Sequence, residues 1–355
     1  MADGEPSADT ALLSPLSPAH PLPLLLSPAH VKRSGTTAYR RVPSAVMTLT
    51  VRDFRPADAK AVADLRRAVV PYRLATPQGI AWEVSTAPAA QCLRLFVAEL
   101  DGRVVGAVQA SVLHDADVPG QAAATPEVHP GHRGRGVGHA LLMAAEEHLV
   151  AVGAERLFAW AVDEPGVPAF AERHGYRRTR RARYLRLDLT AACLPPLPSV
   201  LPSGVLLHTG ADFEADPHPL YAADAEVTAD EPGDVTCDAT AYDDWLLHTW
   251  EHPHIDLDLT SVVTVGGEIA AFALAATDGR ARYSSAMTGT RRAFRGRGLA
   301  RLAKTASLLR ARDAGCTEAF THNDADNVPM LAVNHAFGYR PFAGAWRYVR
   351  EAARD

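Results

Sequence analysis

Cysteine is scarce in this 355-residue chain, and its four copies, Cys92, Cys193, Cys237 and Cys316, have no C-x-x-C spacing. That scarcity excludes a disulfide framework and a zinc knuckle as the basis of the fold. An excess of one charge is also lacking: the net charge is −5 and no long run of Lys or Arg occurs, so nucleic acid is not an expected partner. Uninterrupted apolar runs of the ~20 residues that a membrane helix needs are missing as well. Asp3 and Glu5 stand where a signal peptide would be basic. We therefore expect a cytoplasmic protein with no membrane partner.

The composition, with 47% apolar and 22% charged residues, is that of a globular protein, and the length fits two domains. Residues 1–46 are rich in Pro, Ser and Ala without helical or strand periodicity, which predicts a disordered tail. A second proline cluster marks residues 191–203 as a stiff linker. The predicted domains are therefore residues 47–190 and 204–355.

An internal repeat supports this division. The segment Arg133-Gly-Arg-Gly-Val-Gly138 reappears as Arg295-Gly-Arg-Gly-Leu-Ala300, 162 positions later. His174-Gly-Tyr176 reappears as Phe337-Gly-Tyr339 at an offset of 163. In both halves, strand-like segments precede the glycine turn and a pattern of helical spacing follows it. One unit is therefore used twice, and we call the two units the N-terminal and the C-terminal copy.

A strand that runs into Arg-Gly-x-Gly and then into a helix is suited to binding phosphate. Glycines let the backbone approach a ligand, and a helix N-terminus presents N–H groups and a partial positive charge. Arginines add full charges. Neither copy has the G-x-G-x-x-G spacing of a dinucleotide fold or the Gly-Lys-Ser/Thr ending of a P-loop. A single Arg-Gly-Arg-Gly is usually a surface turn, but two copies in matching surroundings favour a pyrophosphate site.

The turn resembles the Arg/Gln-x-x-Gly-x-Gly/Ala signature of the GCN5-related N-acetyltransferase (GNAT) family, whose loop holds the pyrophosphate of coenzyme A. The resemblance spans most of both halves and implies an α/β (α+β) fold of two tandem domains, each a mixed, largely antiparallel sheet flanked by helices. It implies acetyl-CoA as the co-substrate, and no metal. The residues it implies for cofactor binding are Val128, Arg133, Gly134, Arg135, Gly136, Val137 and Gly138 in one copy and Thr288, Arg295, Gly296, Arg297, Gly298, Leu299, Ala300 and Asn327 in the other.

The catalytic groups are harder to assign. Many family members protonate the leaving thiolate with a tyrosine, but Ala171 and Asn334 occupy that position here. Glu127, before the first turn, is the positional candidate for a general base, with a solvated strand-end carboxylate as the alternative. Residues 211–258 contain fourteen Asp and Glu and no Lys or Arg, which would attract a cationic amine. Within them Asp230, Glu231 and Asp234 are candidates for amine binding or proton removal, although such charges often only solvate a helix.

Two further clusters have alternative readings. His252 and His254 lie beside Asp256 and Asp258, but without the spacing of a known metal site. Six arginines between residues 177 and 186 fit the solvated face of a closing hairpin, with docking to the other domain or to an acidic partner as the second reading.

Together these features predict an acetyl-CoA-dependent N-acetyltransferase that acylates a small, cationic amine, with the chemistry in the C-terminal copy. A coenzyme-A-binding regulatory protein with weak or no catalysis is the alternative, and an enzyme that acylates a hydroxyl or a protein lysine is a third.

Overall fold

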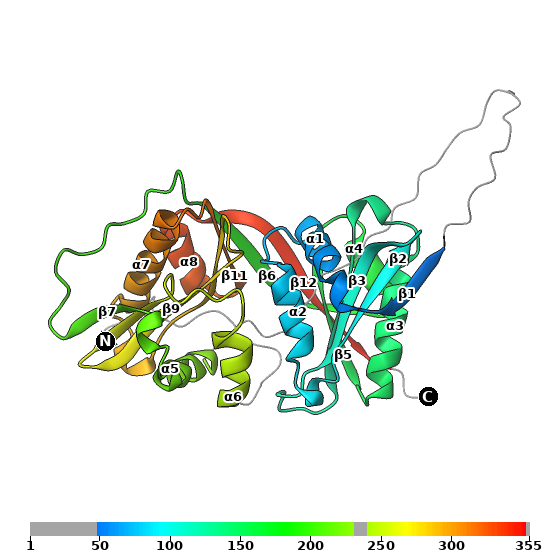
Figure 1. The fold of residues 1–355 in the computed structure, drawn as a ribbon, viewed down its shortest axis with the longest axis horizontal. Helices are drawn as coiled ribbons and strands as arrows, with labels where there is room; N and C mark the ends of the chain where they lie inside the picture. Colours follow the sequence, from blue (N-terminus) through cyan, green and yellow to red (C-terminus); the bar gives the residue numbers. More distant parts are fainter. Residues whose placement is uncertain (1–47, 231–239, 353–355) are drawn as a thin grey trace, which may run out of the picture.

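The computed structural model describes residues 48–230 and 240–352, so the tail at 1–46 and the candidates Glu231 and Asp234 lie outside the described residues. Strands and helices alternate through both halves (Figure 1). The strands are β1 (Leu49–Asp53), β2 (Arg94–Leu100), β3 (Arg103–Val112), β4 (Gln121–Val128), β5 (Arg156–Val162), β6 (Arg177–Asp188), β7 (Val205–Thr209), β8 (Ser261–Val265), β9 (Glu268–Thr277), β10 (Arg282–Thr290), β11 (Glu318–Asp324) and β12 (Arg340–Glu351). The helices are α1 (Ala59–Val69), α2 (Pro77–Ser85), α3 (Val137–Ala151), α4 (Val167–Arg173), α5 (His218–Thr228), α6 (Tyr242–Trp245), α7 (Leu299–Asp313) and α8 (Val328–Ala336).

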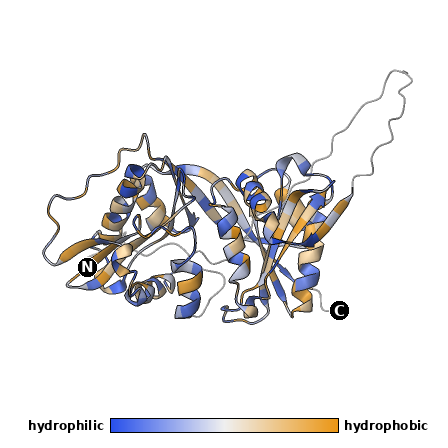
Figure 2. Ribbon diagram, in the orientation of Figure 1, coloured by the Kyte–Doolittle hydropathy of each residue, from blue (hydrophilic) through white to orange (hydrophobic). Residues whose placement is uncertain are grey.

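All twelve strands form one continuous sheet, in the order β1-β2-β3-β4-β5-β12-β6-β11-β10-β9-β8-β7. Most neighbours are antiparallel, but β4–β5 and β10–β11 are parallel. Hydrophobic residues run through the strands of both halves (Figure 2), because helices cover both faces of the sheet and most strand positions are buried. The expectation of mixed, largely antiparallel sheets flanked by helices is confirmed.

The centre of the sheet is built by an exchange of strands between the copies. β12, the last strand of the C-terminal copy, lies between β5 and β6, while β6 of the N-terminal copy lies between β12 and β11 (Figure 1). The pairing of β6 with β12 is symmetric: Arg177 lies opposite Val349 and Arg186 opposite Arg340. A boundary at residues 191–203 therefore separates the two repeats in the sequence. It does not separate their strands in the sheet, because β6 and β12 are exchanged.

The arginines of β6 bind the other half of the molecule. Arg180 forms an ion pair with Asp324 at 2.6 Å and Arg186 with Glu318 at 2.6 Å, both on β11. Docking to the other domain is thus the reading that fits Arg180 and Arg186, whereas Arg177, Arg178 and Arg183 are exposed, as the solvated-face reading expects. β6 is an inner strand rather than one arm of a closing hairpin.

Helix α2 of the N-terminal copy also contacts the C-terminal copy. The Trp82 indole N–H donates to the Leu247 carbonyl (3.1 Å), and the Thr76 hydroxyl lies 2.8 Å from Nε2 of His254. Burial lowers the pKa of His254 to about 4, so this imidazole is neutral at pH 7. His254 therefore takes part in an interface between the copies. Among the described residues no group of three His, Cys, Asp or Glu side chains is arranged to hold a metal ion.

Candidate active site

Each glycine turn links a strand to a long helix in the same way in both copies. Gly136 and Gly298 have φ values of 82° and 72° and stand immediately before α3 and α7. This left-handed conformation favours glycine, so the repeated glycines are needed by the backbone itself. The first arginine of each turn closes it, because Nε of Arg133 donates to the Val128 carbonyl and Nε of Arg295 to the Thr290 carbonyl, both at 3.2 Å.

An opening in the sheet lies beside each turn. β4 pairs with β5 only from Gln121 to Ala123, and β10 pairs with β11 only from Arg282 to Ser284. Beyond these residues the parallel strands diverge, which leaves backbone groups of the inner edges without ladder partners. We call the gap between β4 and β5 the first opening and the gap between β10 and β11 the second opening.

The first opening holds an apolar cavity. Its lining comes from β4, β5, α3, α4 and β12, with Leu142, Ala159, Ala161, Ala171 and Tyr348 among the lining residues. Tyr348 belongs to β12, so the last strand of the C-terminal copy completes the cavity of the N-terminal copy. The Trp160 amide donates to the Thr125 hydroxyl (3.0 Å), which bridges the diverging strands.

The second opening is polar where the first is apolar. Four buried side-chain atoms around it have no hydrogen-bond partner in the structure: Oγ1 of Thr288, Thr290 and Thr321, and Nδ2 of Asn323. Leaving a buried polar atom unpaired costs about 1–3 kcal/mol, so a cluster of four suggests a guest that supplies hydrogen bonds. The register of β10 against β9 shifts between Ser285 and Met287, which adds a bulge on the strand that borders this opening.

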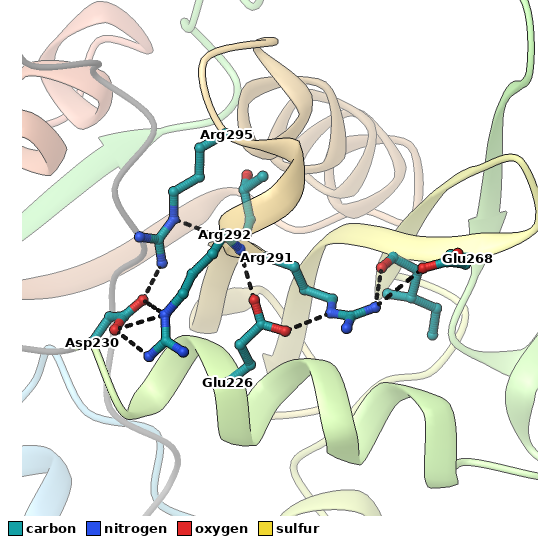
Figure 3. Close-up of polar contacts among 8 residues, drawn as sticks. Glu226, Asp230, Glu268, Arg291, Arg292 and Arg295 are labelled. Carbon is teal, nitrogen blue, oxygen red and sulfur yellow. Dashed lines mark hydrogen bonds and ion pairs between the residues drawn. The ribbon is translucent and has the colours of Figure 1, made fainter.

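Asp230 binds the C-terminal glycine turn (Figure 3). Its carboxylate receives hydrogen bonds from Arg292 (2.6 Å) and from Arg295. One turn earlier on α5, Glu226 accepts from the Arg292 backbone N–H and from Nε of Arg291, both at 2.7 Å. The hydrogen bond from Arg292 is the main cause that lowers the pKa of Asp230. This placement favours an anchoring role for Asp230 over proton removal.

Glu127 is buried rather than solvated, so the alternative of a solvated strand-end carboxylate is wrong. It is 2% exposed and forms an ion pair with Arg66 of α1 (3.5 Å). Arg66 also binds Glu83 of α2 at 2.9 Å and Gln109 of β3 at 2.9 Å. Burial alone would raise the pKa of Glu83, but the charge and the hydrogen bond of Arg66, together with weaker effects of nearby cations, outweigh burial and lower that pKa. Glu127 thus lies within a buried charged cluster of the N-terminal copy.

A buried carboxylate that the motifs did not single out lies on α5. Asp224 is 2% exposed; its Oδ2 accepts from the Trp245 indole (2.7 Å), while its Oδ1 is buried and has no partner among the described residues. Burial raises the pKa of Asp224 to about 6. Tyr221, Tyr242 and Trp245 lie with ring centroids 5.2–6.4 Å apart around the same helix. Since α5 packs on β9 and β10, this carboxylate lies on the sheet face opposite α7.

A buried lysine and two asparagines border the other face. Nζ of Lys304 donates to Oδ1 of Asn334 (2.6 Å), and Nδ2 of Asn334 donates to Oδ1 of Asn323 (2.7 Å). Lys304 and Asn334 are both fully buried. Burial lowers the pKa of Lys304 to about 7.

The model of the acetyltransferase (GNAT) family matches residues 63–176 and again residues 222–339, one match in each copy. The chain belongs to the GNAT family. The chain is therefore an N-acetyltransferase, and the earlier resemblance is confirmed for both halves.

Relatives of known name support the same family. A mycothiol acetyltransferase of Clavibacter michiganensis subsp. michiganensis is 31% identical over 258 residues, which cover 72% of this chain and 79% of that protein. One of Nocardioides sp. is 30% identical over 224 residues, covering 60% of this chain and 74% of the relative.

Solved structures share the tandem GNAT fold. A tandem GNAT protein from the clavulanic acid biosynthesis pathway has a TM-score of 0.69 at 24% identity, over 87% of this chain and 100% of that one. A GCN5-related N-acetyltransferase from Sphaerobacter thermophilus has a TM-score of 0.62 at 22% identity, over 86% and 96% of the two chains. These similarities concern the fold.

The remaining cofactor candidates of this GNAT chain lie around the two turns. Arg135 and Arg297 are exposed on their loops, and Val137, Gly138, Leu299 and Ala300 form the first turns of α3 and α7. Gly134 and Gly296 have φ values of 74° and 75°. Asn327 caps α8 by accepting from the Met330 N–H at 3.5 Å. Apart from Asn327, which lies at the N-terminus of α8, the candidates of each copy thus lie at the N-terminus of one long helix or on the strand before it.

The motif analysis missed Asp224 and Lys304, although both leave a trace in the sequence. Asp224 interrupts the apolar row Leu220, Ala223, Val227 of an amphipathic helix. Lys304 stands where the N-terminal copy, at the offset of 162, has Leu142. A charged residue in a position of helical apolar spacing was the signal in both cases.

Proposed function

We propose that this GNAT protein transfers the acetyl group of acetyl-CoA to the primary amine of a small molecule, with the chemistry in the C-terminal copy. The observation that supports it most is the second opening with its four unpartnered buried atoms beside the N-terminus of α7. The pantetheine arm of coenzyme A offers amide and thioester groups that would satisfy such atoms. The residues present therefore fit acetyl-CoA.

The pyrophosphate of acetyl-CoA would bind at the turn Arg295–Ala300. Backbone N–H groups at the start of α7 and the exposed Arg297 supply the positive potential. Asp230 neutralises part of the charge of Arg292 and Arg295, so the backbone and Arg297 provide most of the attraction. The N-terminal copy, with its own turn and an apolar cavity, would bind cofactor without turning over.

Asp224 is our proposal for the general base. An alkylammonium has a pKa near ~10 and must lose a proton before its nitrogen can attack the thioester carbonyl. A carboxylate with a pKa of about 6 and one unpartnered oxygen accepts a proton more readily than the ion-paired Asp230. The amine nitrogen then attacks, the C–S bond breaks, and the sulfur leaves as a thiolate that takes up a proton.

The acceptor is proposed to be cationic and small. Of the acidic residues in 211–258, Glu226 and Asp230 are paired with arginines, so they add little to the attraction of a cation. Asp224 and the aromatic rings around it are suited to an ammonium, which carboxylates and π-faces both attract. Since the named relatives are mycothiol acetyltransferases, a mycothiol-related amine is the first acceptor to test.

Release of the coenzyme A thiol from acetyl-CoA tests this function with a panel that contains a mycothiol-related amine, polyamines, aminoglycosides, amino acids and lysine peptides. Amine-stimulated release is expected; its absence from folded protein would favour the regulatory alternative.

Two variants identify the copy that carries out catalysis. Gly298→Trp should abolish turnover, whereas Gly136→Trp should not. Because both glycines have similar positive φ values, the two substitutions impose comparable backbone strain. Equal loss in both variants would refute catalysis confined to the C-terminal copy.

A further inference from the structure

The two openings differ at equivalent positions. Four residues that line the first opening, Leu142, Ala159, Ala161 and Ala171, correspond by the offsets of 162 and 163 to Lys304, Thr321, Asn323 and Asn334. All four in the N-terminal copy are apolar, and all four in the C-terminal copy are polar. A buried polar group lowers the stability of the fold unless it is hydrogen-bonded. Four polar residues at positions that are apolar in the other copy therefore indicate a functional role.

The hydrogen bonds in the C-terminal copy run in one direction. Nζ of Lys304 donates to Oδ1 of Asn334, so the oxygen of the Asn334 amide faces the lysine. That orientation turns the Asn334 NH2 group toward Oδ1 of Asn323. The Asn323 NH2 group is thereby turned away from Asn334, and it is the buried Nδ2 that has no partner. This series of three residues therefore ends in a hydrogen-bond donor, Nδ2 of Asn323, that has no acceptor among the described residues.

This donor lies in the second opening. Asn323 belongs to β11, beyond Phe320, the last residue that pairs with β10. Thr321, two residues earlier and so on the same face of the strand, has an unpartnered hydroxyl too. Asn323 is 2% exposed, so water does not readily satisfy its amide.

We propose that Asn323 Nδ2 donates a hydrogen bond to a carbonyl oxygen of the acyl-pantetheine arm, and that Lys304 and Asn334 are positioning residues that orient this amide. The inference rests on the proposed function for the identity of the ligand. It also distinguishes the copies, because the first opening has no counterpart of any member of this chain of hydrogen bonds.

Binding of acetyl-CoA without acceptor, measured by calorimetry, tests the inference in the full chain carrying Gly136→Trp to block the first turn. Asn323→Ala and Asn323→Asp should each weaken binding about three- to tenfold, because neither retains the N–H donor. Lys304→Met should weaken it by a similar factor. The double variant Asn323→Ala/Lys304→Met should bind no more weakly than Asn323→Ala alone, since Lys304 acts only through Asn323.

The control is Asp212→Asn, which changes an exposed carboxylate of the C-terminal half outside both openings and should leave this affinity unchanged. Unaltered affinity in Asn323→Ala, or a double variant whose loss is the product of the two single losses, overturns the inference. If Lys304→Met fails to fold, the Asn323→Asp variant still decides, because it keeps the shape and the acceptor oxygens. Binding with no turnover on any amine would refute the proposed function and leave this inference standing.

Discussion

At the scale of single residues, burial has changed the chemistry of two side chains in opposite directions. Asp224 and Lys304 lie on α5 and α7, on opposite faces of the C-terminal half of the sheet. Burial disfavours the charged form of each, so the pKa of the acid rises and that of the lysine falls. Both shifts bring the groups close to neutral pH, where a proton can be gained or lost.

Asp224→Asn should lower kcat/KM for the amine by at least about a hundredfold, because the amide cannot accept the proton. In the unaltered protein, activity should fall below about pH 6 as Asp224 becomes protonated, and this acid limb should vanish from the residual activity of the variant. Asp212→Asn, which changes an exposed acid of the same half, is the control and should keep the limb. An Asp224→Asn protein with the original pH profile would exclude Asp224 as the base.

The lowered pKa of Lys304 predicts that the stability of the protein depends on pH. Between pH 7 and 10.5 the unfolded chain binds a proton at this lysine and the folded chain does not, so its contribution to stability rises with pH in that window. Tyr339, whose ring faces Nζ at 5.2 Å, stays neutral because burial raises its pKa. The free energy of unfolding should increase between pH 7 and 9 by on the order of 1 kcal/mol per unit more in the original protein than in Lys304→Met. Urea titrations at several pH values would contradict this if the free energy of unfolding changed with pH by the same amount in both proteins.

At the scale of elements, α5 is joined to the turn that precedes α7. Glu226 and Asp230, one helical turn apart, bind Arg291, Arg292 and Arg295 (Figure 3). The N-terminal copy has a looser counterpart, in which Glu164 binds Arg133 at 3.3 Å. These ion pairs connect helix and turn in the C-terminal copy, and with them the proposed acceptor side of the sheet and the proposed cofactor side.

Asp230→Asn should strengthen coenzyme A binding about threefold at low salt, because it removes a negative charge beside two arginines of the turn. The gain should shrink as ionic strength rises. Glu164→Gln is the matched change in the N-terminal copy and should have a smaller effect, since this carboxylate is 47% exposed. Weaker binding by Asp230→Asn at every salt concentration would show that Asp230 mainly holds the arginines in place.

At the scale of the whole molecule, the exchange of β6 and β12 joins the copies into one structure. Ala345 and Tyr348 of β12 pack in the core of the N-terminal copy, and Leu185 and Leu187 of β6 pack in a core with Leu308 of α7. Each copy thus depends on apolar surface supplied by the other.

Among the described residues, no helix has both the length and the apolar character needed to cross a membrane.

Residues 48–190 expressed alone should fail to form a stable monomer. β5 would lose β12, and β6 would lose both of its partners, which exposes strand edges prone to aggregation. Co-expression with residues 191–352 should restore a soluble one-to-one complex, as judged by size-exclusion chromatography and circular dichroism. A folded, monomeric N-terminal fragment would contradict the interdependence.

The sequence predicted what is local and repeated. The glycine turns and the long helices after them follow from periodicity and from residues such as Gly136 and Gly298, whose backbone demands glycine. The tandem family follows from the resemblance of both turns to a known signature. The strand exchange could not be foreseen, because β6 pairs with partners more than a hundred residues away and alternation along a strand says nothing of its neighbour. Asp224 and Lys304 could not be predicted as candidates for a related reason, because burial by other elements of the fold causes their pKa shifts.

The strand order has a consequence for synthesis on the ribosome. The N-terminal half emerges first, yet the strand that completes its sheet is β12, which ends 163 residues after β6. At a synthesis rate of 5–20 residues per second this delay is roughly ten to thirty seconds. During that time the edges of β5 and β6 are open to other nascent chains, so yield should improve when chaperones are abundant. The N-terminal half therefore cannot complete its part of the sheet before β12 has been synthesised.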